Sequence, residues 1–167
     1  MKNLNIKGKM PKDGEGFYKD GKEYGVFLEY DSKDRLIGSY TYQAGILNGP
    51  FERYFPGTTT VSKKGYYREG LLHGTVYDFY ENNQMARESQ YLLGKLEGCM
   101  REFDEDGTIS RIVHYKADKL NGSYEKFSHG RISWAGIYRN GNIVVMARDM
   151  VYLAACRSEL ERDFQYQ

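Results

Sequence analysis

Proline, cysteine, histidine and long apolar runs are all scarce in this chain of 167 residues. It has three prolines, two cysteines and three histidines, and its formal net charge is +1. A nearly neutral chain creates no long-range field that would attract nucleic acid or acidic lipid. No segment approaches the roughly 20 apolar residues of a membrane-spanning helix, and the polar residues 1–16 lack the apolar run of a signal peptide. We therefore expect a cytoplasmic protein without nucleic-acid binding or membrane insertion.

The two cysteines, Cys99 and Cys156, fit no metal-ligand spacing. Without an export signal, we expect both to remain thiols, with no disulfide, in a reducing compartment.

Tyrosine and glycine are abundant, with 16 and 19 copies. Tyrosine favours strands, whereas glycine favours turns that need a positive φ. This composition predicts many short strands joined by tight turns.

The tyrosines and glycines recur with a period of 23 to 25 residues, which is the strongest signal in the sequence. Six copies start at Tyr18, Tyr42, Tyr67, Tyr91, Tyr115 and Tyr138. In most copies a glycine follows at +3, an apolar residue at +5 and a second glycine at +7; Asp118 replaces one glycine and tolerates the same turn geometry. We predict a tight connection at each G-x-L-x-G segment, held by structural glycines that include Gly45, Gly49, Gly70, Gly74, Gly94, Gly98 and Gly122.

Large apolar residues stand two and five positions after each second glycine, as Phe51 and Tyr54 do. Positions of different parity lie on opposite faces of an ideal strand, so either both faces are partly covered or a bulge intervenes. A polar turn and a returning strand follow, and Gly65 and Gly136 mark places where a side chain would be squeezed out. Each repeat is thus predicted to be a β-hairpin.

The predicted fold class is an all-β repeat: an elongated single-layer antiparallel sheet of about six stacked hairpins over residues 17–145. Residues 1–16 are an N-terminal extension or a partial capping repeat.

In the C-terminal segment, residues 146–167, apolar residues recur at intervals of three and four. This spacing predicts an amphipathic α-helix over Arg148–Phe164, although Ser158 and Glu161 also fit a capping box that restarts a shorter helix. We expect the helix to cap the last repeat, with docking to a partner as the alternative.

The repeat Y-x-x-G-x-L-x-G-x-[aromatic]-x-x-[aromatic] resembles the MORN repeat. The copy without departures consists of Tyr42, Gly45, Leu47, Gly49, Phe51 and Tyr54. The resemblance covers roughly Phe17 to Ile143. A large residue such as Phe51 stands where the eukaryotic-type repeat has a further glycine, which points to the bacterial variant, including antitoxins of the YwqK type. The resemblance implies an open array of hairpins that acts as a binding or scaffolding surface.

The repeat does not bring candidate catalytic residues together. His73, His114 and His129 occupy three different places in it, with no accompanying base, carboxylate or ligand set. The glycines form no phosphate-binding loop. We therefore predict no enzymatic activity, no cofactor and no metal site.

The variable positions three and four residues after the second glycine are predicted to form a charged and aromatic face. Trp134 stands where other repeats have Gly38, Lys63, Arg87 and Arg111, and fits either an interface anchor or a ring packed under the C-terminal helix. The candidate partner-binding residues are Tyr77, Asp78, Arg101, Glu102, Glu125, Lys126 and Trp134.

From these observations we expect a non-enzymatic protein–protein interaction module. The leading hypothesis is a bacterial antitoxin- or immunity-like protein that binds and neutralises another protein, such as a co-encoded toxin or effector. The alternative is a structural scaffold or membrane-associated tether that acts through the repeat face. The sequence is also compatible with a homo-oligomer.

Overall fold

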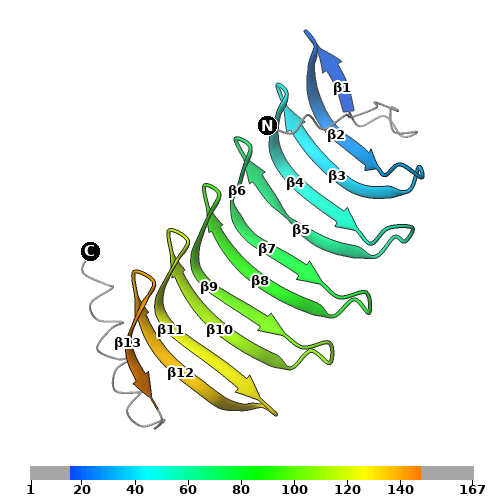
Figure 1. Cartoon of the computed structure of the whole chain (residues 1–167). Helices are drawn as coiled ribbons and strands as arrows, with labels where there is room; N and C mark the ends of the chain where they lie inside the picture. The colour runs from blue at the N-terminus through cyan, green and yellow to red at the C-terminus, as the bar shows by residue number, and fades with distance from the viewer. Residues whose placement is uncertain (1–15, 148–167) are drawn as a thin grey trace.

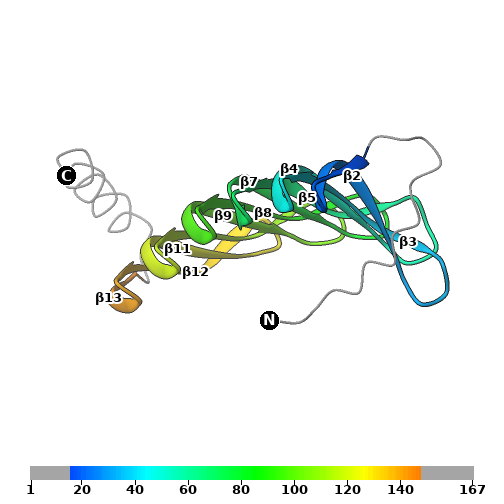
Figure 2. The same ribbon diagram turned by 90° about the horizontal axis from the view of Figure 1, so that it is seen from above.

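The computed structural model describes residues 16–147, which form one antiparallel sheet of 13 strands (Figure 1). The strands are β1 (Gly16–Lys19), β2 (Lys22–Tyr30), β3 (Leu36–Gln43), β4 (Ile46–Tyr54), β5 (Val61–Arg68), β6 (Leu71–Leu72), β7 (Gly74–Phe79), β8 (Met85–Leu92), β9 (Lys95–Phe103), β10 (Ile109–Lys116), β11 (Lys119–Ser128), β12 (Arg131–Arg139) and β13 (Asn142–Ala147). Neighbours in sequence are neighbours in the sheet, and β6 and β7 both pair with β5. Figure 2 shows this sheet from above as a single twisted layer. The predicted all-β array of hairpins is therefore confirmed.

The connections lie alternately at the two opposite ends of the strands (Figure 1). Short connections lie at one end and longer ones at the other, except that the connection between β11 and β12 is also a two-residue turn, His129–Gly130. Each short connection has two residues with positive φ, such as Ala44 (54°) and Gly45 (81°). Two consecutive positive φ values define the type I′ turn, whose twist matches that of the strands it joins. Asp118 adopts a φ of 67° in the same place, as its turn chemistry predicts.

The second glycine of each repeat lies inside a strand rather than in the connection, which corrects the prediction of a turn spanning both glycines. Gly49 is in β4 with a φ of 143°, and a Cβ there would lie 2.6 Å from the Cβ of Thr41. The register between β3 and β4 shifts between Tyr40 and Tyr42, beside this glycine. The missing side chain therefore permits a bulge.

Five of the short turns are hydrogen-bonded to the repeat before them. The N–H of Gly70 donates to the carbonyl of Leu47 at 2.7 Å, and that of Gly94 donates to Leu72 at 2.8 Å. Asp118 and Gly141 repeat the contact with Leu96 and Leu120. The first glycine and the apolar residue of the motif thus join neighbouring repeats through their backbones.

The core forms a row across the sheet, built from the position two residues after the second glycine and from its register partner Val113 on β10. The most buried of these side chains is that of Val76, with 0% exposure. Glycine is required beside the large members: a Cβ on Gly65 would lie 2.9 Å from Val76 Cγ2 and 3.0 Å from Phe51 Cε1. Gly136 likewise leaves room for the ring of Trp134. Buried members of the row are Phe27, Phe51, Val76, Met100 and Val113.

A second bulge lies in the returning strand of five hairpins. Asp78 pairs with Arg87 and the next residue, Phe79, pairs with Met85, so Ala86 is the extra residue on the returning strand. Ile37, Ser62, Ser110 and Ser133 take the corresponding place in the other hairpins.

The predicted C-terminal helix is wrong where the structure describes its segment. No residue of 16–147 is helical, and Met146 and Ala147 belong to β13, with Met146 paired to Gly136. The β-branched run Ile143 to Val145 favours a strand, and the edge of β12 supplies its hydrogen-bond partners. The remainder of the predicted helix, including Cys156, lies outside the described residues, as do residues 1–15; Gly16 already belongs to β1.

Candidate functional site

Strand register places the two variable positions of each repeat on opposite faces of the sheet. Asp78 lies two residues from Val76, so its side chain shares the face that carries the core row. Tyr77 lies between them and belongs to the opposite face. We call the first the ladder face, after the row of charged side chains described next.

Seven charged residues, one from each of seven neighbouring strands, pair in register across the ladder face. We call this row the charge ladder; in strand order it is Arg53, Lys63, Asp78, Arg87, Glu102, Arg111 and Lys126. Neighbouring strands lie about 4.8 Å apart, so the ladder extends for about 29 Å.

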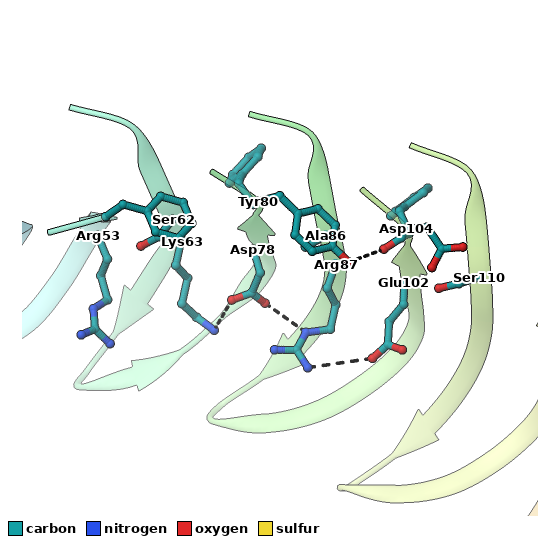
Figure 3. Close-up of a pocket in the computed structure, with 13 residues that line it drawn as sticks. Arg53, Ser62, Lys63, Asp78, Tyr80, Ala86, Arg87, Glu102, Asp104 and Ser110 are labelled. Atoms are coloured by element: carbon teal, nitrogen blue, oxygen red, sulfur yellow. Dashed lines mark hydrogen bonds and ion pairs between the residues drawn. The ribbon is translucent and has the colours of Figure 1, made fainter. Parts of the chain in front are cut away.

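The middle of the charge ladder is a chain of ion pairs (Figure 3). Asp78 accepts hydrogen bonds from Lys63 Nζ at 2.9 Å and from Arg87 Nε at 3.0 Å. Glu102 lies 4.0 Å from Arg87 and accepts a hydrogen bond from Arg111 Nε at 2.7 Å. Each carboxylate therefore lies between two cations.

Cations exceed carboxylates in the ladder by five to two. Its outermost members, Arg53 and Lys126, are exposed, and their side chains form no hydrogen bond or ion pair with residues 16–147. Arg53 lies directly opposite Lys63, and Lys126 lies directly opposite Arg111. Like charges in directly opposed positions destabilise a sheet, so both ends of the ladder favour an added anion.

The paired arginines are held firmly in their charged form. Partial burial opposes the charge of Arg87, but the hydrogen bond and charge of Asp78 outweigh it and raise the pKa of Arg87. The pKa of Arg111 is raised by its hydrogen bond to the Tyr124 hydroxyl and by Glu102. Arg87 and Arg111 thus contribute fixed positive charges to the ladder.

A groove of about 620 Å³ runs beside the charge ladder across strands β4 to β10. Its floor holds the extra residues of three successive bulges, Ser62, Ala86 and Ser110, all of them small. Figure 3 shows these residues next to the ladder side chains. Charged lining residues are Arg53, Lys63, Asp78, Arg87, Glu102 and Asp104, and aromatic ones are Phe55, Phe79, Tyr80 and Phe103.

The opposite face carries isolated contacts of charged residues instead of a continuous row. The ammonium of Lys64 lies 5.8 Å from the ring centroid of Tyr77 and 5.3 Å from that of Phe79. Arg101 donates a hydrogen bond to Glu88 at 2.8 Å. Lys64 and Arg101 therefore have local partners on this face.

The predicted partner-binding residues do not form one surface. Asp78, Glu102, Lys126 and Trp134 lie in one row on the ladder face, with Trp134 directly opposite Lys126. The others belong to the opposite face: Tyr77, Arg101 and Glu125. Of these, Glu125 is only 6% exposed and contributes little surface.

Trp134 packs against the tyrosines of its own face. Its ring lies 5.0 Å from that of Tyr124, edge to face, and 6.4 Å from that of Tyr138. It is half-buried at the end of the ladder.

Sequence reasoning missed Arg53, Lys63, Arg87 and Arg111 as site residues. Three of them stand on returning strands, at one fixed place in the repeat, where they oppose Asp78 and Glu102 of the outgoing strands. A signal was present in the sequence: acidic residues on the outgoing strands stand opposite basic residues on the returning strands when the two halves of a hairpin are aligned with one another.

The structure brings two of the residues considered for chemistry close to one another. Cys99 and His114 are register partners on β9 and β10, and His114 Nδ1 lies 3.0 Å from Ser123 Oγ. His129 Nδ1 lies 3.0 Å from Ser128 Oγ in a turn. His73 is half-buried, and its Nδ1 has no hydrogen-bond partner within residues 16–147. The three histidines therefore do not share a site.

The described part of the chain holds no cluster of three or more histidine, cysteine or acidic residues placed to bind a metal ion. Among these same residues, none belongs to a helix that could cross a bilayer.

No protein-family model matches the chain, and no curated protein matches it in sequence.

Proposed function

We propose that this protein is a non-enzymatic binding module that recognises a partner protein through the ladder face. The observation that carries the proposal is the charge ladder with its two outer cations, Arg53 and Lys126, unpaired within residues 16–147. An ordered row of charges about 29 Å long matches the dimensions of a protein surface better than those of a small molecule. Electrostatic complementarity of this kind sets partner choice and speeds association.

Within this class, the resemblance to bacterial MORN-type repeats favours an antitoxin- or immunity-like role. The protein would neutralise a toxin or effector encoded beside it by covering a negatively charged surface of that protein. Neutralisation by coverage requires no catalytic group, only an extended complementary face.

Co-expression with the product of the neighbouring gene tests the proposal. We expect the two proteins to purify together and the host cells to be protected from any toxicity. The double variant Arg53→Glu, Lys126→Glu reverses the unpaired charges while keeping the central ion pairs, and should weaken capture strongly. Arg101→Gln on the opposite face is the control and should leave it unchanged. Absence of any complex with the wild-type protein would refute the proposal.

A second candidate is a tether to an anionic membrane, which the same surplus of positive charge favours. Co-sedimentation with phosphatidylglycerol-containing vesicles at physiological ionic strength tests it. Salt-sensitive binding that the double variant loses would support the tether, and failure to sediment would eliminate it.

A further inference from the structure

We propose that the groove beside the charge ladder receives an extended segment of the partner in the polyproline II conformation, with a carboxylate that pairs with Arg53. The inference rests on the proposed function and deepens it, because it names the partner element and its place on the sheet.

Shape favours an extended segment. The groove crosses successive strands instead of forming a closed cavity, and its floor is built from Ser62, Ala86 and Ser110. These residues are the bulge positions of three successive hairpins, where the first hairpin has the larger Ile37. Small side chains at three consecutive bulges leave a continuous trench into which a backbone can settle.

The period of the groove favours polyproline II over a β-strand. Its lining repeats every two strands, about 9.6 Å. A polyproline II helix advances about 9.3 Å in three residues, so every third side chain meets the same place in the next hairpin. A β-strand repeats its side-chain direction about every 6.6 Å, which does not match the 9.6 Å repeat of the groove lining. Aromatic-lined grooves bind polyproline II segments through this kind of matching.

Aromatic rings in the lining supply the apolar contacts that such a segment needs. Phe55 and Tyr80 are half-buried, so each ring keeps a surface for proline or aliphatic side chains. Tyr80 is fixed in place by donating a hydrogen bond to the carbonyl of Phe103 at 2.8 Å. Phe55 and Tyr80 both stand six residues after the second glycine of their repeats, so their rings lie one hairpin apart.

Charge sets the orientation of the segment. Lys63 and Arg87 already bind Asp78, so their charges are compensated. Arg53 is the lining cation without a hydrogen bond or ion pair among residues 16–147, and it lies at the β4 end of the groove. One carboxylate at this end, followed by apolar residues toward β10, is the complementary pattern.

The test uses the full chain and a labelled, amidated peptide with one aspartate followed by a run of prolines about 24 Å long, the span of the groove. We expect binding by fluorescence anisotropy, with affinity reduced about tenfold or more when lysine replaces the aspartate. A similar loss is expected when a glycine–serine run replaces the prolines, because it is not preorganised. Equal binding of the glycine–serine peptide would overturn the proposed conformation.

Two variants test the location. Ala86→Trp fills the trench and should abolish binding, whereas Ser133→Trp places the same ring at the corresponding bulge outside the groove and should leave it intact. Arg53→Gln should weaken the aspartate peptide about tenfold and leave the lysine peptide unchanged.

Amide chemical shifts of the wild-type protein locate the binding site without relying on the folding of any variant. Shifts at Ser62, Ala86 and Ser110 on titration with the peptide are expected. Shifts centred on Arg101 or Glu88, or no binding, would overturn the groove as the site. If the partner still forms a complex while the peptide fails, the groove is wrong and the proposed function stands.

Discussion

The side chain of Asn121 accepts a hydrogen bond from the backbone N–H of Asn140 at 3.1 Å, joining one repeat to the turn of the next. Glu97 makes the equivalent contact with Ala117 at 2.8 Å, and Asn48 makes it with Glu69 at 3.4 Å. The position before the second glycine, variable in sequence, therefore caps the first residue of the following type I′ turn.

His73 occupies this capping position without capping anything. Its Nδ1 is buried and has no hydrogen-bond partner among the described residues, while the equivalent turn residue is Leu93. We expect His73→Asn to restore the cap and raise the free energy of unfolding by about 1 kcal/mol. Asn121→Ala, which removes an existing cap, should lower it by a similar amount. Urea denaturation measures both, and a destabilised His73→Asn protein would refute the capping role.

Leu93 adopts a φ of 49°, which costs a leucine roughly 1 kcal/mol and an asparagine much less. It is 49% exposed, so little packing is lost on its replacement. Leu93→Asn recreates the Asn-Gly turn found at Asn140 and Gly141, and we expect a stabilisation of about 1 kcal/mol. The reverse change, Asn140→Leu, should cost about as much in thermal or chemical unfolding.

Two glycines with positive φ should respond very differently to alanine. A Cβ on Gly49 would meet Thr41 at 2.6 Å, whereas nothing lies within 4 Å of one on Gly141. Gly49→Ala combines backbone strain with overpacking and should cost more than about 3 kcal/mol. Gly141→Ala meets only the strain of its φ and should cost about 1 kcal/mol. Similar losses at the two positions, measured by denaturation, would contradict the close approach of the strands at the bulge.

Stability should fall at alkaline pH. Burial raises the pKa of Tyr42, Tyr67, Tyr91 and Tyr115, and burial together with Glu52 raises the pKa of Tyr54 to about 12. An unfolded tyrosine ionises near pH 10, so the stabilisation is complete below that value and is lost as pH rises toward about 12. Circular dichroism and tyrosinate absorbance should change together across this window. Full tyrosine ionisation near pH 10 with the sheet intact would disprove the burial.

Much of the fold could be predicted from the chain because its information is local. The spacing from Tyr42 to Tyr54 predicts a hairpin with a tight turn that includes Gly45, since backbone conformation depends on neighbouring residues. The type I′ geometry at Ala44 and Gly45, and the place of Gly49 inside β4, came only from the structure. The end of the array could not be predicted in this way. Met146 fits a helical spacing along the chain, but β12 offers it backbone partners, and this pairing between strands places it in β13.

The sequence by itself determined the repeat, the hairpins and the turn chemistry of this protein. Only the tertiary structure decided which variable residues act together, because two bulges in each repeat set the register, and register sets the face of every side chain. It separated Tyr77 from Asp78, joined Asp78 to Lys63 and Arg87, and placed Ser62 and Ala86 in one groove. Such contacts join residues on different strands, and strand pairing brings these residues together although they are distant in the sequence.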